Sequence, residues 1–84
     1  MPKVAALYET LRGSPRRVMH FRDFVRILVA FGFACVRQTG SHRVFEHPAV
    51  PKPLIVQPRG KEAAPYQLQE FLDMVETSGL RLGE

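Results

Sequence analysis

Apolar residues recur at helical spacing in three stretches of the chain: residues 4–12, residues 21–31 and the stretch that begins at Pro65. Positions i, i+3, i+4 and i+7 form one face of a helix, so the spacing predicts three amphipathic helices. Gly32 and Gly79 follow the second and third stretches, where a left-handed glycine closes a helix. The predicted buried faces are Val4, Leu7, Tyr8 and Leu11, then Phe24, Val25, Leu28 and Phe31, and finally Leu68, Phe71, Leu72 and Val75.

Between the second and third helices the pattern becomes that of β-strands. Residues 33–38, 42–47 and 54–57 are predicted to be strands, with a tight turn at residues 39–41 and a loop at residues 59–61. Prolines follow the second and third strands and end them. Side chains alternate along the second strand, which places His42, Val44 and Glu46 on one face and Arg43, Phe45 and His47 on the other.

This order of elements, helix, helix, three strands, helix, predicts an α+β fold. Short connections join the strands, so the sheet is expected to be antiparallel with the helices packed on one of its faces. At 84 residues the chain has room for one domain. We expect a single domain over residues 1–84, with an N-terminal helical extension at residues 1–19 and a core at residues 20–80.

Composition and cysteine usage predict a soluble cytoplasmic protein. Hydrophobic residues make up 45% of the chain, which is typical of a folded domain. The single cysteine, Cys35, excludes an internal disulfide and a cysteine-based zinc site, and we interpret it as a small core residue. The start of the chain lacks the apolar stretch of a signal peptide, and the longest apolar run, residues 27–36, is too short to cross a bilayer.

Charge is distributed unevenly along the chain. Residues 1–61 contain eleven Lys/Arg and three Asp/Glu, a net charge of +8, whereas residues 62–84 have a net charge of −4. A basic body with an acidic C-terminal element favours binding of a polyanion on one side of the molecule.

His42 is the strongest candidate for chemistry. It follows Gly40, which permits a tight turn close to a ligand, and Ser41, which adds a hydroxyl donor. Histidine suits either proton transfer in metal-free RNA cleavage because its ordinary pKa lies near neutrality. The cations that could stabilise charge on the phosphate are Arg37, Arg43, Arg59 and Lys61. The chain has no zinc-ligand spacing and no glycine-rich phosphate loop, so we expect no metal and no cofactor.

Two stretches of sequence resemble the HicA family of mRNA interferase toxins. The first is Phe24-x-x-x-Leu28-x-x-x-Gly32-Phe33 followed by Arg37-Gln38-x-Gly40-Ser41-His42-x-x-Phe45. The second, Ile55-x-Gln57-Pro58 and Gly60-Lys61-x-x-x-Pro65-Tyr66-Gln67, resembles a long-form subgroup with an extra N-terminal helix. Together the resemblance covers about residues 20–80.

The resemblance implies a double-stranded-RNA-binding-domain-like fold and ribosome-independent cleavage of mRNA, with His42 as the catalytic histidine. It also implies a HicB antitoxin as partner, which would cover that site. Many short-form members carry a second histidine near the end of the third strand, where this chain has Pro58 and Arg59. His47 is predicted to face away from His42, so the second proton-transfer group is left open.

Two other classes of function remain open from the sequence. A non-catalytic RNA-binding module of the same fold would hold RNA through its basic residues and leave it intact. A protein-interaction module is favoured by the acidic last helix and by Tyr66 and Leu82, but it does not account for the basic body of the chain.

Overall fold

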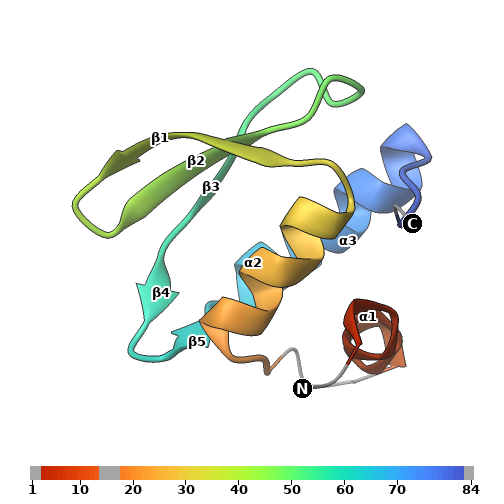
Figure 1. Cartoon of the computed structure of the whole chain (residues 1–84), viewed down its shortest axis with the longest axis horizontal. Helices are drawn as coiled ribbons and strands as arrows, with labels where there is room; N and C mark the ends of the chain where they lie inside the picture. Colours follow the sequence, from red (N-terminus) through yellow and green to blue (C-terminus); the bar gives the residue numbers. More distant parts are fainter. Residues whose placement is uncertain (1–2, 14–17, 83–84) are drawn as a thin grey trace.

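Three helices and two antiparallel sheets form the computed structural model, which describes residues 3–13 and 18–82. Figure 1 shows α2 and α3 on one face of the larger sheet, with α1 on the far side of these helices. The predicted α+β architecture is therefore confirmed. The elements are α1 (Val4–Gly13), α2 (Phe21–Ala30), β1 (Ala34–Thr39), β2 (His42–Glu46), β3 (Leu54–Val56), β4 (Pro58–Arg59), β5 (Glu62–Ala63) and α3 (Pro65–Ser78). Residues 1, 2 and 14–17 of the predicted N-terminal extension lie outside the described part.

The larger sheet has the order β1-β2-β3, so β2 is its central strand. Phe45 on β2 lies opposite Cys35 on one side and Leu54 on the other. Phe45, Leu54 and Val56 are buried beneath the sheet, which identifies the face that packs on the helices. The predicted alternation along β2 is confirmed: Phe45 faces the core, whereas His42 is exposed.

A two-stranded ribbon, β4–β5, occupies the region predicted to be a loop at residues 59–61. Backbone bonds tie this ribbon to the start of α2: Phe21 N donates to Lys61 O at 2.8 Å, and Ala63 N donates to Met19 O at 2.9 Å. Each strand has only two residues, which is too short for an alternating pattern to appear in the sequence. The ribbon therefore depends on contacts with a distant segment of the chain.

The predicted closures of α2 and α3 are both present. Gly32 has a φ of 98°, and Phe33 N donates to Leu28 O at 3.0 Å. Gly79 has a φ of 63°, and the N–H of the residue after it donates to Val75 O at 3.0 Å. In both cases a left-handed glycine turns the chain back, so that the next N–H satisfies a carbonyl of the last helical turn.

An aromatic cluster joins the three helices. The ring of Phe71 on α3 meets four other rings edge-on, with centroid distances between 5.2 and 6.4 Å. Edge-to-face pairs at these distances add a specific attraction to the burial of apolar area. The four rings are those of Tyr8, Phe24, Phe31 and Phe33.

Two details of the predicted core are wrong. Cys35 is exposed, because β1 is an edge strand and all six of its residues are exposed. On α2 the buried face includes Phe21 and Ile27, whereas Val25 is only partly buried. Helical spacing gives the approximate direction of the buried face of a helix. The packing of neighbouring elements decides which residues at the edges of that face are covered.

We expect Gly32→Ala to lower the free energy of unfolding by about 1–2 kcal/mol, because an L-residue is strained at positive φ. The added Cβ would also lie 3.0 Å from His47 Nε2. Denaturant unfolding measures the change. Gly13→Ala is the matched control, since no atom lies within 4 Å of a Cβ there. Equal stability of Gly32→Ala and the parent would contradict the prediction.

Candidate functional site

His47 has a structural role. Its Nε2 lies 2.9 Å from Phe31 O, and its Nδ1 accepts a hydrogen bond from Ala49 N at 3.0 Å. An Nδ1 that accepts in a neutral ring requires the proton to be on Nε2, which therefore donates to the Phe31 carbonyl. The ring also packs edge-on against Phe33 with a centroid distance of 5.1 Å. His47 thus joins the end of β2 to the end of α2, with both ring nitrogens in use.

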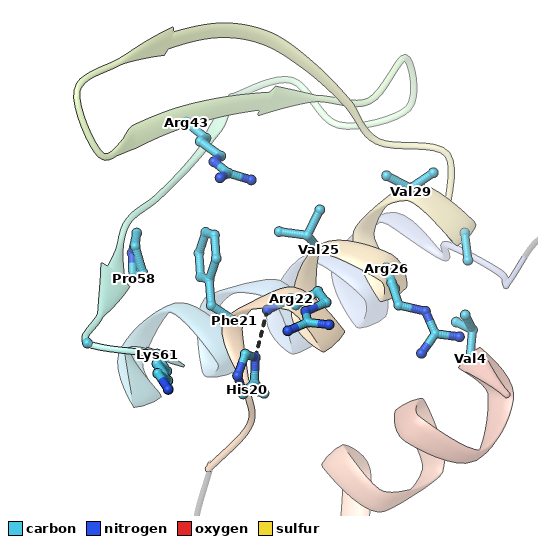
Figure 2. Close-up of a pocket in the computed structure, with 12 residues that line it drawn as sticks. Val4, His20, Phe21, Arg22, Val25, Arg26, Val29, Arg43, Pro58 and Lys61 are labelled. Atoms are coloured by element: carbon cyan, nitrogen blue, oxygen red, sulfur yellow. Dashed lines mark hydrogen bonds between the residues drawn. The ribbon is translucent and has the colours of Figure 1, made fainter. Parts of the chain in front are cut away.

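His20 begins α2. The sequence offers no Ser, Thr, Asp or Asn at this position, and the structure uses the imidazole instead: Nδ1 accepts a hydrogen bond from Arg22 N at 3.3 Å. The histidine satisfies one of the N–H groups that a helix leaves unpaired at its start. Figure 2 shows His20 at the edge of a groove beside α2, on the helix side of the sheet.

His42 is the first residue of β2 and is exposed at the end of the β1–β2 hairpin. Within the described residues its ring has no hydrogen-bond partner, in contrast to His20 and His47. Gly40 has a φ of 59°, which allows the tight turn that precedes it. His42 is paired with Thr39 across the hairpin, and this ladder holds its backbone on a regular strand. Both ring nitrogens are therefore available to a ligand on a rigid support.

A β-bulge places Arg37 on the same face of the sheet as His42. Cys35 lies opposite the buried Phe45, but the next paired residue is Arg37, opposite Val44. Val36 is the extra residue between them. An unbroken strand would keep Cys35 and Arg37 on one face, whereas the bulge moves Arg37 to the outer face. It thereby brings one of the predicted cations to the side of the sheet that carries His42.

Gln57 and Arg59 follow the end of β3. Val56 pairs with Arg43, the residue after His42, and Gln57 follows this last pair at the end of β3. Gln57 and Arg59 line a small cavity of about 200 Å³ with the exposed Tyr66 of α3. Ser41, also predicted for the site, is exposed in the turn before His42.

Gln67 holds this part of the chain in place, a role that the sequence did not reveal. Only 3% of its surface is exposed, and it is the one buried polar residue in the described part of the chain. Its side-chain oxygen accepts a hydrogen bond from Gln57 N at 3.3 Å. A buried amide stabilises a structure when it is paired, so Gln67 fixes the backbone next to His42.

Arg43 and Lys61 lie on the opposite side of the sheet from His42. The Arg43 guanidinium carbon is 5.2 Å from the centroid of the Phe21 ring, a cation–π contact. Figure 2 shows Arg43 above and Lys61 beside the groove along α2. The structure therefore brings Arg37 to the His42 face, leaves Ser41 exposed in the adjoining turn, and separates Arg43 and Lys61 from them.

No group of three or more potential metal ligands is present in the part of the chain that the structure describes. None of its helices is long and apolar enough to span a membrane. Among the described residues, the other two histidines lie on the helix side of the sheet, so no second imidazole stands beside His42.

A family model described as the HicA toxin of bacterial toxin–antitoxin matches residues 21–76, about two thirds of the chain. This range contains the β1–β2 hairpin with His42, the ribbon and most of α3. No curated protein and no solved structure shows significant similarity to the chain.

The contacts of His47 and His42 predict different effects on stability. We expect His47→Ala to lower the free energy of unfolding by about 1–3 kcal/mol, because it leaves a partly buried carbonyl and an N–H without partners. His42→Ala removes an exposed ring and should change stability by no more than about 0.5 kcal/mol. Thermal and denaturant unfolding of both variants test this. A large loss of stability in His42→Ala would show that its ring supports the fold.

Proposed function

Because the chain belongs to the HicA toxin family of bacterial toxin–antitoxin systems, we propose that it is a toxin that cleaves RNA with His42 as the proton-transferring group. Membership of the family makes the protein the toxin of such a system and implies an antitoxin partner. The proposal adds three points to family membership: the substrate is RNA, His42 transfers the proton, and the antitoxin is HicB-like.

The availability of the His42 ring carries the proposal. Proton transfer requires at least one imidazole nitrogen that the fold does not use, and within the described residues both nitrogens of His42 meet this condition. His47 uses both nitrogens to join β2 to α2, and His20 uses one to begin α2. In the proposed reaction, His42 removes the proton from a ribose 2′-OH. The resulting oxygen attacks the adjacent phosphorus, and the 5′-oxygen leaves with a proton from water, giving a cyclic phosphate end. The hydroxide that remains accepts the proton held by His42, which restores the neutral imidazole.

Cations on the outer face would stabilise the charge on the phosphate. Arg37 faces the same side as His42 because of the bulge, and Ser41 precedes the histidine in the turn. Arg59 lies two residues beyond Gln57 and lines the small cavity with it. Guanidinium groups suit this task because they bind two phosphate oxygens at once. We assign Arg37, Ser41 and Arg59 to RNA at this face, and Arg43 and Lys61 to the other side of the molecule.

A non-catalytic RNA-binding module is the second candidate function. It is favoured by the absence of another imidazole on the His42 face within the described residues. A cleaving enzyme with one histidine must take the proton for its leaving group from water, which makes the reaction slower. Cleavage of cellular mRNA by a toxin does not require a fast enzyme, so we retain catalysis as the first proposal.

The first test is RNA cleavage in EDTA by the purified protein and by His42→Ala. We expect cleavage by the parent without metal, and a loss of about 10²–10⁴-fold in the variant, the usual contribution of a general acid or base. His20→Asn is the matched control: it removes an imidazole and keeps a side chain that begins helices well. Equal cleavage by His42→Ala and the parent would exclude the mechanism. Bound but intact RNA with the parent would favour the binding module.

A second test measures the contribution of Arg37 to RNA affinity. In the His42→Ala background, Arg37→Ala should weaken single-stranded RNA binding and reduce the slope of log affinity against log salt by about 0.7, the value for one phosphate contact. Arg81→Ala is the control, because Arg81 is exposed after α3 and lies outside the proposed site. An unchanged slope for Arg37→Ala would remove Arg37 from the RNA-binding face.

A further inference from the structure

A groove of about 700 Å³ runs along α2 on the side of the sheet opposite to His42. Figure 2 shows its boundaries: α2 forms one wall, Arg43 of β2 and Pro58 of the ribbon form the other, and Val4 of α1 lies at one end. The volume is in the range of protein pockets that hold a ligand or a partner's side chains. Neither the His42 chemistry nor the core accounts for this groove.

The floor of the groove is apolar and lacks a partner. Phe21, Val25 and Val29 are spaced four residues apart on α2, so they form a straight line about 12 Å long at the helical rise per residue. Val29 is 59% exposed. Phe21 is buried at 7% exposure and Val25 is partly buried, so the line opens to water at its Val29 end. An exposed apolar side chain that continues such a line is typical of a surface that a partner covers.

The rim of the groove is cationic. Arg22 and Arg26 follow the apolar line on one side, and Arg43 and Lys61 stand on the other. Arg26 Nη1 lies 3.7 Å from Asp23 Oδ1 in an ion pair, so the net positive charge of the rim comes from Arg22, Arg43 and Lys61. The described residues that line the groove include no aspartate or glutamate. A partner that seats apolar side chains here would be held in register by acidic residues beside them, and acidic flanks would also speed its association.

The lining favours a protein segment over RNA. Single-stranded RNA binds through aromatic faces that stack on bases, whereas this floor is mostly aliphatic. Among the described residues that line the groove, the aromatic rings are those of Phe21 and His20. Arg43 already lies over the Phe21 ring, and His20 Nδ1 accepts a hydrogen bond from Arg22 N. An apolar centre bounded by a polar rim is typical of protein–protein interfaces.

We propose that this groove is a docking site for the antitoxin, which inserts an acidic segment with apolar side chains along the Phe21–Val25–Val29 line. This inference rests on the proposed function, because it takes the partner to be the antitoxin. His42 and Arg43 are consecutive residues of β2 that face opposite sides of the sheet. An antitoxin anchored in the groove therefore needs to pass only the end of the β1–β2 hairpin to reach His42.

The test is binding of the antitoxin encoded in the adjacent reading frame, measured by calorimetry with the full chain. Val29→Glu places a negative charge on the floor, and we expect it to weaken the affinity at least about tenfold, as hot-spot changes do. RNA cleavage by Val29→Glu without antitoxin should equal that of the parent, and the antitoxin should no longer suppress it at the concentration that suppresses the parent. Val18→Glu is the matched control: Val18 is 60% exposed and lies outside the groove.

A charge variant tests the rim separately. Arg22→Glu should weaken the antitoxin affinity, and the loss should diminish as salt is added, because exposed charges are screened. Lys52→Glu is the control, since Lys52 is exposed on the segment between β2 and β3 and does not line the groove.

Two outcomes would overturn the inference. Unchanged antitoxin affinity in both Val29→Glu and Arg22→Glu would show that the partner binds elsewhere. Loss of RNA binding by Val29→Glu, with antitoxin affinity retained, would assign the groove to RNA. Failure of the parent to cleave RNA would count against the proposed function alone, because the affinity measurements do not depend on cleavage.

Discussion

The edge-to-face packing around Phe71 is the interaction on which the helical layer depends. One ring on α3 meets rings from α1, from α2 and from the turn that leads into β1. An 84-residue chain buries a modest share of its surface, so a few large side chains must supply much of its apolar burial. Because α2 and α3 are held together in this way, they present a continuous apolar surface to the sheet. β2 packs against that surface through Phe45.

The alternation of β2 then divides the molecule into two functional sides. Phe45 faces the helices, so Arg43 and His47 face them too, and His42 faces outward. His42 and Arg43, which are consecutive on β2, therefore lie on different surfaces. His42 lies on the outer face with Arg37, and Arg43 lies at the cationic groove beside α2. Under the proposed function, this division would let the antitoxin anchor on one side without altering the residues that we assign to RNA.

The three histidines show how neighbouring atoms decide the role of one residue type. His47 and His20 each satisfy backbone groups at the ends of α2 that would otherwise lack partners. His42 satisfies none in the described part of the chain. A histidine that contributes no hydrogen bond to the fold is free to exchange protons with a substrate, and this difference is visible only in the contacts of each ring.

The sequence by itself determined the order of elements, the closure of α2 at Gly32, the β1–β2 turn and the outward direction of His42. These follow from local rules of helical spacing, glycine conformation and strand alternation, which act over a few residues. Only the tertiary structure decided the β4–β5 ribbon, the exposure of Cys35, the bulge that turns Arg37 outward and the groove beside α2. Each of these depends on which distant segments pack together, and the local sequence pattern does not predict that packing.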